Sequence, residues 1–162
     1  MESLRVQRDG LWDAELAAGV IAVHAGREGA LLPMLHALQE AFGWVPPAAI
    51  PLAAQALNLS RAEVHGVVSF YHDFRHVPPG RHVLKLCQAE ACQARGGRAI
   101  SARAEAALGV ALGETTPDGR VTLEPIYCLG LCASGPAALA DGRPVGRLDA
   151  DRLDALLAEV GR

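Results

Sequence analysis

The chain has 162 residues, 51% of them hydrophobic, and a formal net charge of −3 at neutral pH; this length suits one ordinary domain or two small ones. No apolar run approaches the roughly 20 residues of a membrane-spanning helix, the start lacks a signal-peptide pattern, and no basic field is present to hold nucleic acid. We therefore expect a soluble, cytoplasmic protein without a membrane or nucleic-acid partner.

The first half of the chain is predicted to be helical. Apolar residues recur at helical intervals in residues 13–25, 30–42 and 48–57. A fourth helix is expected to begin at Arg61, because Ser60 and Glu63 form a capping box, and to carry apolar residues as far as Phe74. Short connections place such helices side by side, so residues 1–78 are predicted to form a small up-and-down bundle with a partner-docking role.

Three of the few aromatic residues fall in one short segment: Phe70, Tyr71 and Phe74. One interpretation is that they belong to the core of the bundle or to its seam with the next domain. The other is that they form a surface on which a partner docks, since aromatic residues are enriched at the cores of interfaces.

Residues 79–162 show the pattern of a mixed α/β domain. Strands are predicted at residues 82–86, 112–116, 121–127, 137–140 and near 144–146, with helices at residues 97–108 and after Asp149. Turns are expected at Asp118–Gly119 and at Asp141–Gly142. This order is compatible with a thioredoxin-like sandwich, so the predicted fold class is α+β, with a helical bundle followed by that domain.

The only four cysteines form two close pairs, Cys87 with Cys92 and Cys128 with Cys132, spaced C-x4-C and C-x3-C. Four thiolates gathered together suit an iron–sulfur cluster, a zinc ion or two disulfides. Structural zinc sites favour C-x2-C, which is absent, whereas C-x4-C occurs in plant-type ferredoxins. A reducing cytoplasm disfavours disulfides. The spacing therefore favours a [2Fe–2S] cluster and leaves the other two interpretations open.

Both pairs follow predicted strands, whose loops lie at the same edge of a sheet, so each pair could hold one iron of a shared cluster. Gly130 and Gly135 lack a Cβ and can adopt positive φ, which would bring backbone N–H groups close to sulfur. The alternative interpretation is that these glycines only make turns. None of the six histidines lies inside a cysteine loop, which disfavours a Rieske-type centre. No C-x-x-C redox pair or Gly-rich nucleotide site is present, and we predict no catalytic residues in this chain.

Several segments carry a resemblance to a known family: residues 83–87 (VLKLC), 91–92 (AC), 95–97 (RGG), 128–132 (CLGLC) and, upstream, 63–71 (EVHGVVSFY). This set resembles the thioredoxin-like [2Fe–2S] ferredoxins. That family includes the 24-kilodalton subunit of NADH:quinone oxidoreductase, a subunit of bidirectional hydrogenases, and the gamma subunit of NAD-dependent molybdenum formate dehydrogenases. The resemblance implies one [2Fe–2S] cluster ligated by Cys87, Cys92, Cys128 and Cys132.

Two segments look most like the formate dehydrogenase gamma subunit: residues 69–75 (SFYHDFR) and the loop 88–91 (QAEA). In the respiratory subunit the second cysteine is usually followed by His-Val-Arg-Gly, whereas residues 93–96 here read QARG. The resemblance implies an electron-transfer subunit that exchanges single electrons with the FMN of a beta subunit. An alpha subunit with the molybdenum cofactor would oxidise formate to CO2 while NAD is reduced. The respiratory subunit, the hydrogenase subunit and a structural zinc module with four cysteine ligands remain alternatives.

Overall fold

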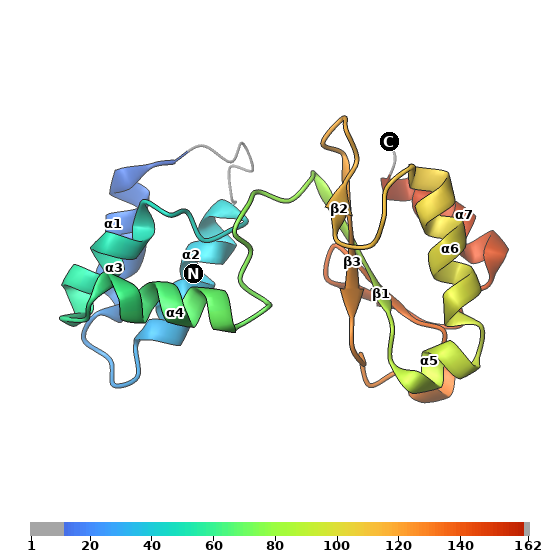
Figure 1. Cartoon of the computed structure of the whole chain (residues 1–162), viewed down its shortest axis with the longest axis horizontal. Helices are drawn as coiled ribbons and strands as arrows, with labels where there is room; N and C mark the ends of the chain where they lie inside the picture. The colour runs from blue at the N-terminus through green and yellow to red at the C-terminus, as the bar shows by residue number, and fades with distance from the viewer. Residues whose placement is uncertain (1–11, 161–162) are drawn as a thin grey trace. The chain divides into compact units, whose positions relative to one another are not determined.

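The computed structural model describes residues 12–160 of the chain. The chain divides into two units, residues Met1–Pro78 and Pro79–Arg162 (Figure 1). Each unit has its own hydrophobic core. No helix in residues 12–160 is long and apolar enough to cross a membrane.

The first unit consists of helices. These are α1 (Ala14–His24), α2 (Leu31–Phe42), α3 (Ala49–Leu57) and α4 (Arg61–Phe70). The four helices share one core, whose largest fully buried side chains are Met34, Leu35, Leu38, Val45, Val64 and Val68. The predicted helical content and the predicted starts of these helices agree with the structure to within about a residue.

The capping box at the start of α4 is present as predicted. The Glu63 N–H donates to the Ser60 Oγ over 3.2 Å, and the Ser60 N–H donates to the Glu63 carboxylate over 2.8 Å. The bonds from the Ser60 N–H and hydroxyl lower the pKa of the Glu63 carboxyl. The cap is therefore complete above the ordinary pKa of a glutamate and weakens as the pH falls through the lowered value.

The prediction that α4 carries its apolar stripe to Phe74 is wrong, because the helix ends at Phe70 and Tyr71 is already extended. Phe74 nevertheless lies in the helical core with 2% of its surface exposed. Phe70 is 72% exposed and Tyr71 is 43% exposed. The aromatic segment thus divides: Phe74 belongs to the core, and the other two rings lie at the surface.

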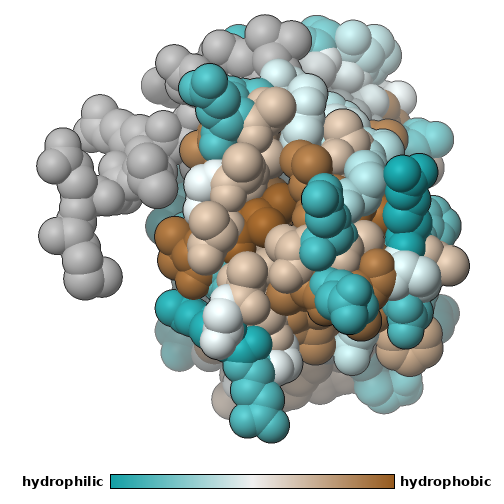
Figure 2. Space-filling view, turned by 90° about the vertical axis from the view of Figure 1, so that its left-hand side faces the viewer, coloured by the Kyte–Doolittle hydropathy of each residue, from teal (hydrophilic) through white to brown (hydrophobic). Residues whose placement is uncertain are grey.

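Two helices of the first unit, α1 and α3, carry few charges. Glu15 is the only acidic or basic residue of α1 apart from His24, and α3 contains none. Val23 on α1 is 67% exposed. Figure 2 shows apolar residues gathered across one face of this unit and bordered by hydrophilic ones. Helices that are apolar on all sides are usually buried against other parts of a protein or against a partner. This composition agrees with the docking role expected of the bundle, and that role stays a prediction.

The second unit is a five-stranded mixed sheet with helices. Its strands are β1 (His82–Cys87), β2 (Glu114–Thr115), β3 (Val121–Ile126), β4 (Ala138–Ala140) and β5 (Arg143–Val145), in the order β2-β3-β1-β4-β5. Its helices are α5 (Glu90–Ala94), α6 (Gly97–Leu108), the 3-10 turn η1 (Cys132–Ser134) and α7 (Ala150–Val160).

Helices α6 and α7 lie on the same face of this sheet (Figure 1). Leu84 and Leu86 of β1 and Leu123 of β3 point to that face and pack with residues of both helices. On the other face Lys85 pairs with Glu124 over 3.2 Å. The alternation of apolar and polar residues along β1 therefore separates the core from a polar face, as the period of a strand requires. The unit is a thioredoxin-like domain.

Replacement of Ser60 by alanine removes the acceptor for the Glu63 N–H. We expect the helical unit to lose about 1 kcal/mol of stability, seen as a lower thermal midpoint by circular dichroism of the full chain. Ser69→Ala is the matched control, because Ser69 lies in the last turn of the same helix and bonds only the Gly66 carbonyl, at 3.1 Å. Equal losses in the two variants would contradict a role for the cap.

Candidate metal centre

The first cysteine pair follows the central strand of the sheet. Cys87 is the last residue of β1, where its N–H donates to the Ala137 carbonyl over 3.0 Å and the next N–H, from Gln88, donates to Ile126 over 2.8 Å. These bonds hold the end of β1 between its neighbours. Cys92 lies within α5, a short helix that the sequence did not predict.

The second pair follows β3. Strands β1 and β3 run parallel, with Cys87 beside Ile126, so their carboxyl ends reach the same edge of the sheet. Cys128 lies two residues beyond Ile126 and has a left-handed backbone, with φ of 74°. Cys132 begins the turn η1. The prediction that both pairs exit at one edge agrees with this register.

The two glycines predicted to support the sulfurs differ in their roles. Gly130 has φ of 74°, and its N–H lies 3.4 Å from the Cys128 Sγ, as expected. Gly135 has φ of −69°, so the expected positive φ is wrong there. Gly135 instead supplies space: a Cβ at this position would lie 3.2 Å from the Cys92 Sγ and 3.5 Å from the Cys132 carbonyl oxygen. The segment that follows the second cysteine pair therefore packs directly against Cys92 of the first pair.

The four thiols differ in exposure. Cys87 and Cys92 are 4% and 2% exposed and form a small apolar cluster with Ala137. The side chains packed around this cluster are those of Ala89, Ile126, Leu129 and Leu131. Cys128 and Cys132 are exposed. A group bound by all four would have one buried end and one end at the surface.

The sulfur geometry fits metal coordination by pairs. All four cysteines are free, and the Cys128 and Cys132 sulfurs are 3.8 Å apart. Two thiolates roughly 2.3 Å from one tetrahedral metal ion are separated by about this distance, whereas a disulfide needs about 2.05 Å. In residues 12–160, no three or more His, Cys, Asp or Glu side chains converge on one ion position. The spacing of Cys128 and Cys132 therefore suits two sulfurs bound to one metal ion.

Hydrogen bonds prepare Cys87 to be a thiolate. Burial alone raises the pKa of this thiol, but hydrogen bonds outweigh burial and leave the pKa below its ordinary value. The donors are the backbone N–H groups of Ala89, Cys128 and Leu129 and the thiol of Cys92. Two of these donors belong to the second cysteine loop, so that loop stabilises negative charge on the first pair.

Cys92 and Cys132 resist ionisation, because the pKa of each thiol is raised. Burial raises the pKa of Cys92, and its hydrogen bond to Cys87 raises it further. The hydrogen bond with Cys128 raises the pKa of Cys132, and the Cys87 charge adds to that effect. The two pairs therefore share one electrostatic environment, in which several thiolates need nearby positive charge. Iron ions bound between the pairs would supply that charge, so the donor set fits a [2Fe–2S] cluster.

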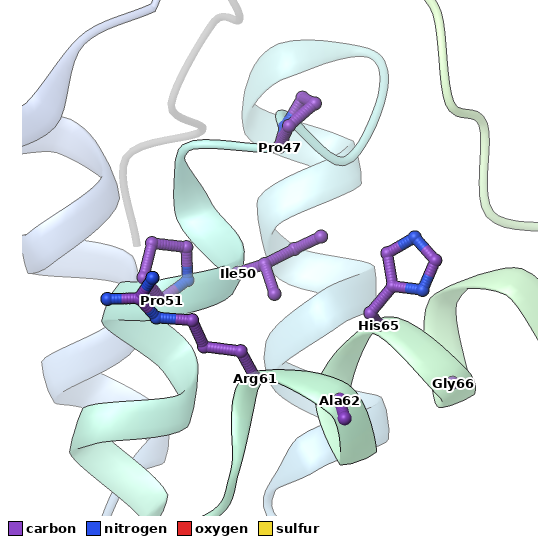
Figure 3. A pocket seen from close by; sticks show the side chains of 7 residues that line it. All are labelled: Pro47, Ile50, Pro51, Arg61, Ala62, His65 and Gly66. Carbon is purple, nitrogen blue, oxygen red and sulfur yellow. The ribbon is translucent and has the colours of Figure 1, made fainter.

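A concave region lies on the helical unit, and its lining side chains are drawn in Figure 3. It is lined by Pro47, Ile50, Pro51, Arg61, Ala62, His65 and Gly66. Its lining offers one imidazole and no thiol or carboxylate, so it does not suit the coordination chemistry considered for the cysteines.

A thioredoxin-like domain with two cysteine pairs at one sheet edge defines a class of small iron–sulfur proteins. The chain belongs to the thioredoxin-like [2Fe–2S] ferredoxin family, whose model matches residues 17–161. This match confirms the resemblance noted from the cysteine motifs, and it includes most of the helical unit.

Curated relatives and solved structures agree with the family assignment. The chain is 34% identical over 134 residues to NADH-quinone oxidoreductase subunit 2 of Thermus thermophilus, covering 82% of this chain and 74% of that protein. It is 32% identical over 133 residues to the NADP-reducing hydrogenase subunit HndA of Solidesulfovibrio fructosivorans, covering 82% and 78%. A crystal structure of an NAD+-reducing [NiFe]-hydrogenase in the H2-reduced state matches with a TM-score of 0.71 and 33% identity, over 81% of this chain and only 22% of that longer chain.

Replacing Cys92 by serine tests the ligand set. A hydroxyl is a harder and less acidic ligand than a thiol, so we expect loss of the cluster or a strong change in its visible spectrum. Circular dichroism should show the helical unit still folded, because its core does not include this residue. A spectrum and iron content equal to those of the unmodified protein would remove Cys92 from the ligands.

Gly135→Ala tests the space beside Cys92. Its added Cβ would crowd the Cys92 Sγ at 3.2 Å without backbone strain, so we expect a shifted visible spectrum and a loss of iron to a chelator about three to ten times faster. Gly19→Ala is the matched control, since a Cβ on Gly19 meets nothing within 4 Å. The idea fails if the two variants lose iron at the same rate.

Proposed function

We propose that this chain is the [2Fe–2S] electron-transfer subunit of a cytoplasmic, NAD-linked oxidoreductase complex. Its ligands are Cys87, Cys92, Cys128 and Cys132. The observation that carries the proposal is the meeting of two thiol pairs at the carboxyl ends of β1 and β3. Membership of a [2Fe–2S] ferredoxin family supports it.

The cluster, when bound, supplies a site that takes up and releases one electron at a time. This chain's residues hold it and set its surroundings. Cys87 and Cys92 would hold the cluster from the buried side of the site, and Cys128 and Cys132 from the exposed side. Backbone N–H groups directed at Cys87 stabilise the charge that its sulfur carries. Leu129 and Leu131 pack over the buried pair and limit the access of water to it.

The surface beside the exposed pair suits a redox partner. No charged residue occurs from residue 125 to residue 140, and Tyr127, next to Cys128, is 75% exposed. Interface cores are depleted of charge and enriched in aromatic residues. We assign this face to the flavin-bearing subunit, the partner with which single electrons would be exchanged. The chain itself carries no catalytic residues, and FMN, NAD and any molybdenum cofactor belong to its partners.

The finer proposal is that the complex is an NAD-dependent formate dehydrogenase and that this chain is its gamma subunit. The sequences of residues 69–75 and 88–91 support this choice. Its direct partner is then a beta subunit with FMN, and an alpha subunit with the molybdenum cofactor oxidises formate. The names of the relatives support a second candidate, the 24-kilodalton-type subunit of an NADH:quinone oxidoreductase or of an NAD-linked hydrogenase.

The test is to purify the full chain anaerobically, first alone and then with its native partners. For the chain alone we expect visible absorption, a paramagnetic signal after reduction by one electron, and about two irons and two sulfides per chain. A colourless protein with stoichiometric zinc would rule the proposal out.

The purified complex identifies the assembly. Formate-dependent reduction of NAD with a molybdenum-containing subunit supports the formate dehydrogenase. Hydrogen-dependent reduction of NAD, or quinone reduction by NADH, supports the second candidate and overturns the finer proposal. The isolated chain is expected to show none of these activities, which is the control for activity carried by the partners.

A further inference from the structure

Arg95 lies between the two cysteine segments. It follows α5, where its N–H donates to the Cys92 carbonyl over 3.2 Å. Its side chain reaches across to the second segment, and its Nε–H donates to the Gly135 carbonyl over 2.9 Å. One residue thus bonds to both segments that carry the proposed ligands.

The bonded carbonyl belongs to the glycine that packs against Cys92. A Cβ on Gly135 would lie 3.2 Å from the Cys92 Sγ, 3.5 Å from the Cys132 carbonyl oxygen and 3.6 Å from the Arg95 Cδ. Any movement of this glycine therefore changes the space around a buried sulfur. The Arg95 side chain, which holds the Gly135 carbonyl, restrains that movement.

The charged side chain of Arg95 also passes near Cys92, because a Cβ on Gly135 would lie 3.6 Å from the Arg95 Cδ and 3.2 Å from the Cys92 Sγ. A guanidinium is always protonated in proteins, and the side-chain bond of Arg95 goes to a neutral carbonyl. Other arginines are paired with carboxylates, such as Arg103 with Asp154. Among residues 12–160, Arg95 has no such ion pair. Its positive charge is thus available to interact with an anionic group held by the cysteines.

We propose that Arg95 is a positioning residue for the cluster, which clamps Gly135 against Cys92 through Nε–H and favours the reduced cluster through its charge. This inference rests on the proposed function. The clamp keeps the second segment in place, so it should slow the loss of iron. The charge interacts more strongly with the reduced form because that form carries one more negative charge.

Three substitutions separate the clamp from the charge. Arg95→Gln keeps an N–H donor at the position of Nε and removes the charge. Arg95→Lys keeps a positive charge and replaces Nε by a carbon atom, which removes the donor at that position and moves the N–H groups one atom further along the side chain. Arg95→Met removes both while keeping an unbranched side chain of similar shape.

The first measurement is a potentiometric titration followed by visible and paramagnetic spectra. In Arg95→Gln and Arg95→Met, we expect the ratio of reduced to oxidised cluster at a fixed potential to fall about three- to tenfold; tenfold corresponds to about 59 mV for one electron. Arg95→Lys should stay within about twofold of the unmodified protein. The difference in this ratio between the unmodified protein and the two uncharged variants should become smaller at high salt, because Arg95 is exposed and salt screens its charge.

The second measurement addresses the clamp. In Arg95→Lys and Arg95→Met, we expect iron loss to a chelator to accelerate about three- to tenfold, since only a hydrogen bond between the segments is lost. In the cluster-free proteins, the amides of Ser134 and Gly135 should exchange hydrogen faster, because the turn they close onto Leu131 and Cys132 loosens. Arg95→Gln should match the unmodified protein in both experiments.

Arg103→Gln is the control, because it removes an arginine charge further along α6 that is bound to Asp154. It should change neither measurement. The inference is overturned if all three Arg95 variants behave like the unmodified protein, or if Gln and Lys cause the same defects, which would indicate packing alone. If the unmodified protein binds no cluster, the proposed function fails. If the unmodified protein binds a cluster and the Arg95 variants change neither measurement, only this inference fails.

Discussion

The parallel pairing of β1 with β3 is the constraint on which the site depends. In this register Cys87 lies beside Ile126, so two loops separated by some forty residues of sequence leave the sheet at one edge. The backbone bonds from Cys87 to Ala137 and from Gln88 to Ile126 then tie the end of β1 to both neighbours. The core of Leu84, Leu86 and Leu123 under α6 and α7 keeps this register in place, since a slip by one residue would expose it.

The site is asymmetric, and the asymmetry suits electron transfer. Cys87 and Cys92 are buried, so water is excluded from one end of the site. Cys128 and Cys132 lie at the surface on an uncharged loop. Backbone N–H groups help to stabilise the buried Cys87 thiolate. Such donors are fixed by the fold and need little rearrangement when charge changes, which is the general advantage of preorganised dipoles.

The helical unit has a different basis for its stability. It is built from short, alanine-rich helices whose ends are set by local signals, such as the Ser60–Glu63 cap and the left-handed Gly43. Its buried side chains are mostly small or aliphatic, and its surface includes apolar residues such as Val23. This composition accounts for a unit that has its own core and still leaves apolar side chains at its surface.

The sequence by itself determined the order of helices and strands, the α4 cap and the two thiol pairs, because capping, periodicity and ligand spacing are local properties. It missed α5, which is too short for a periodic signal, and the end of α4 at Phe70. Only the tertiary structure decided that Gly135 provides space beside Cys92 rather than a positive φ, and that Arg95 bonds the second segment. Those relations depend on how residues forty positions apart meet across the sheet, and no local pattern encodes that meeting.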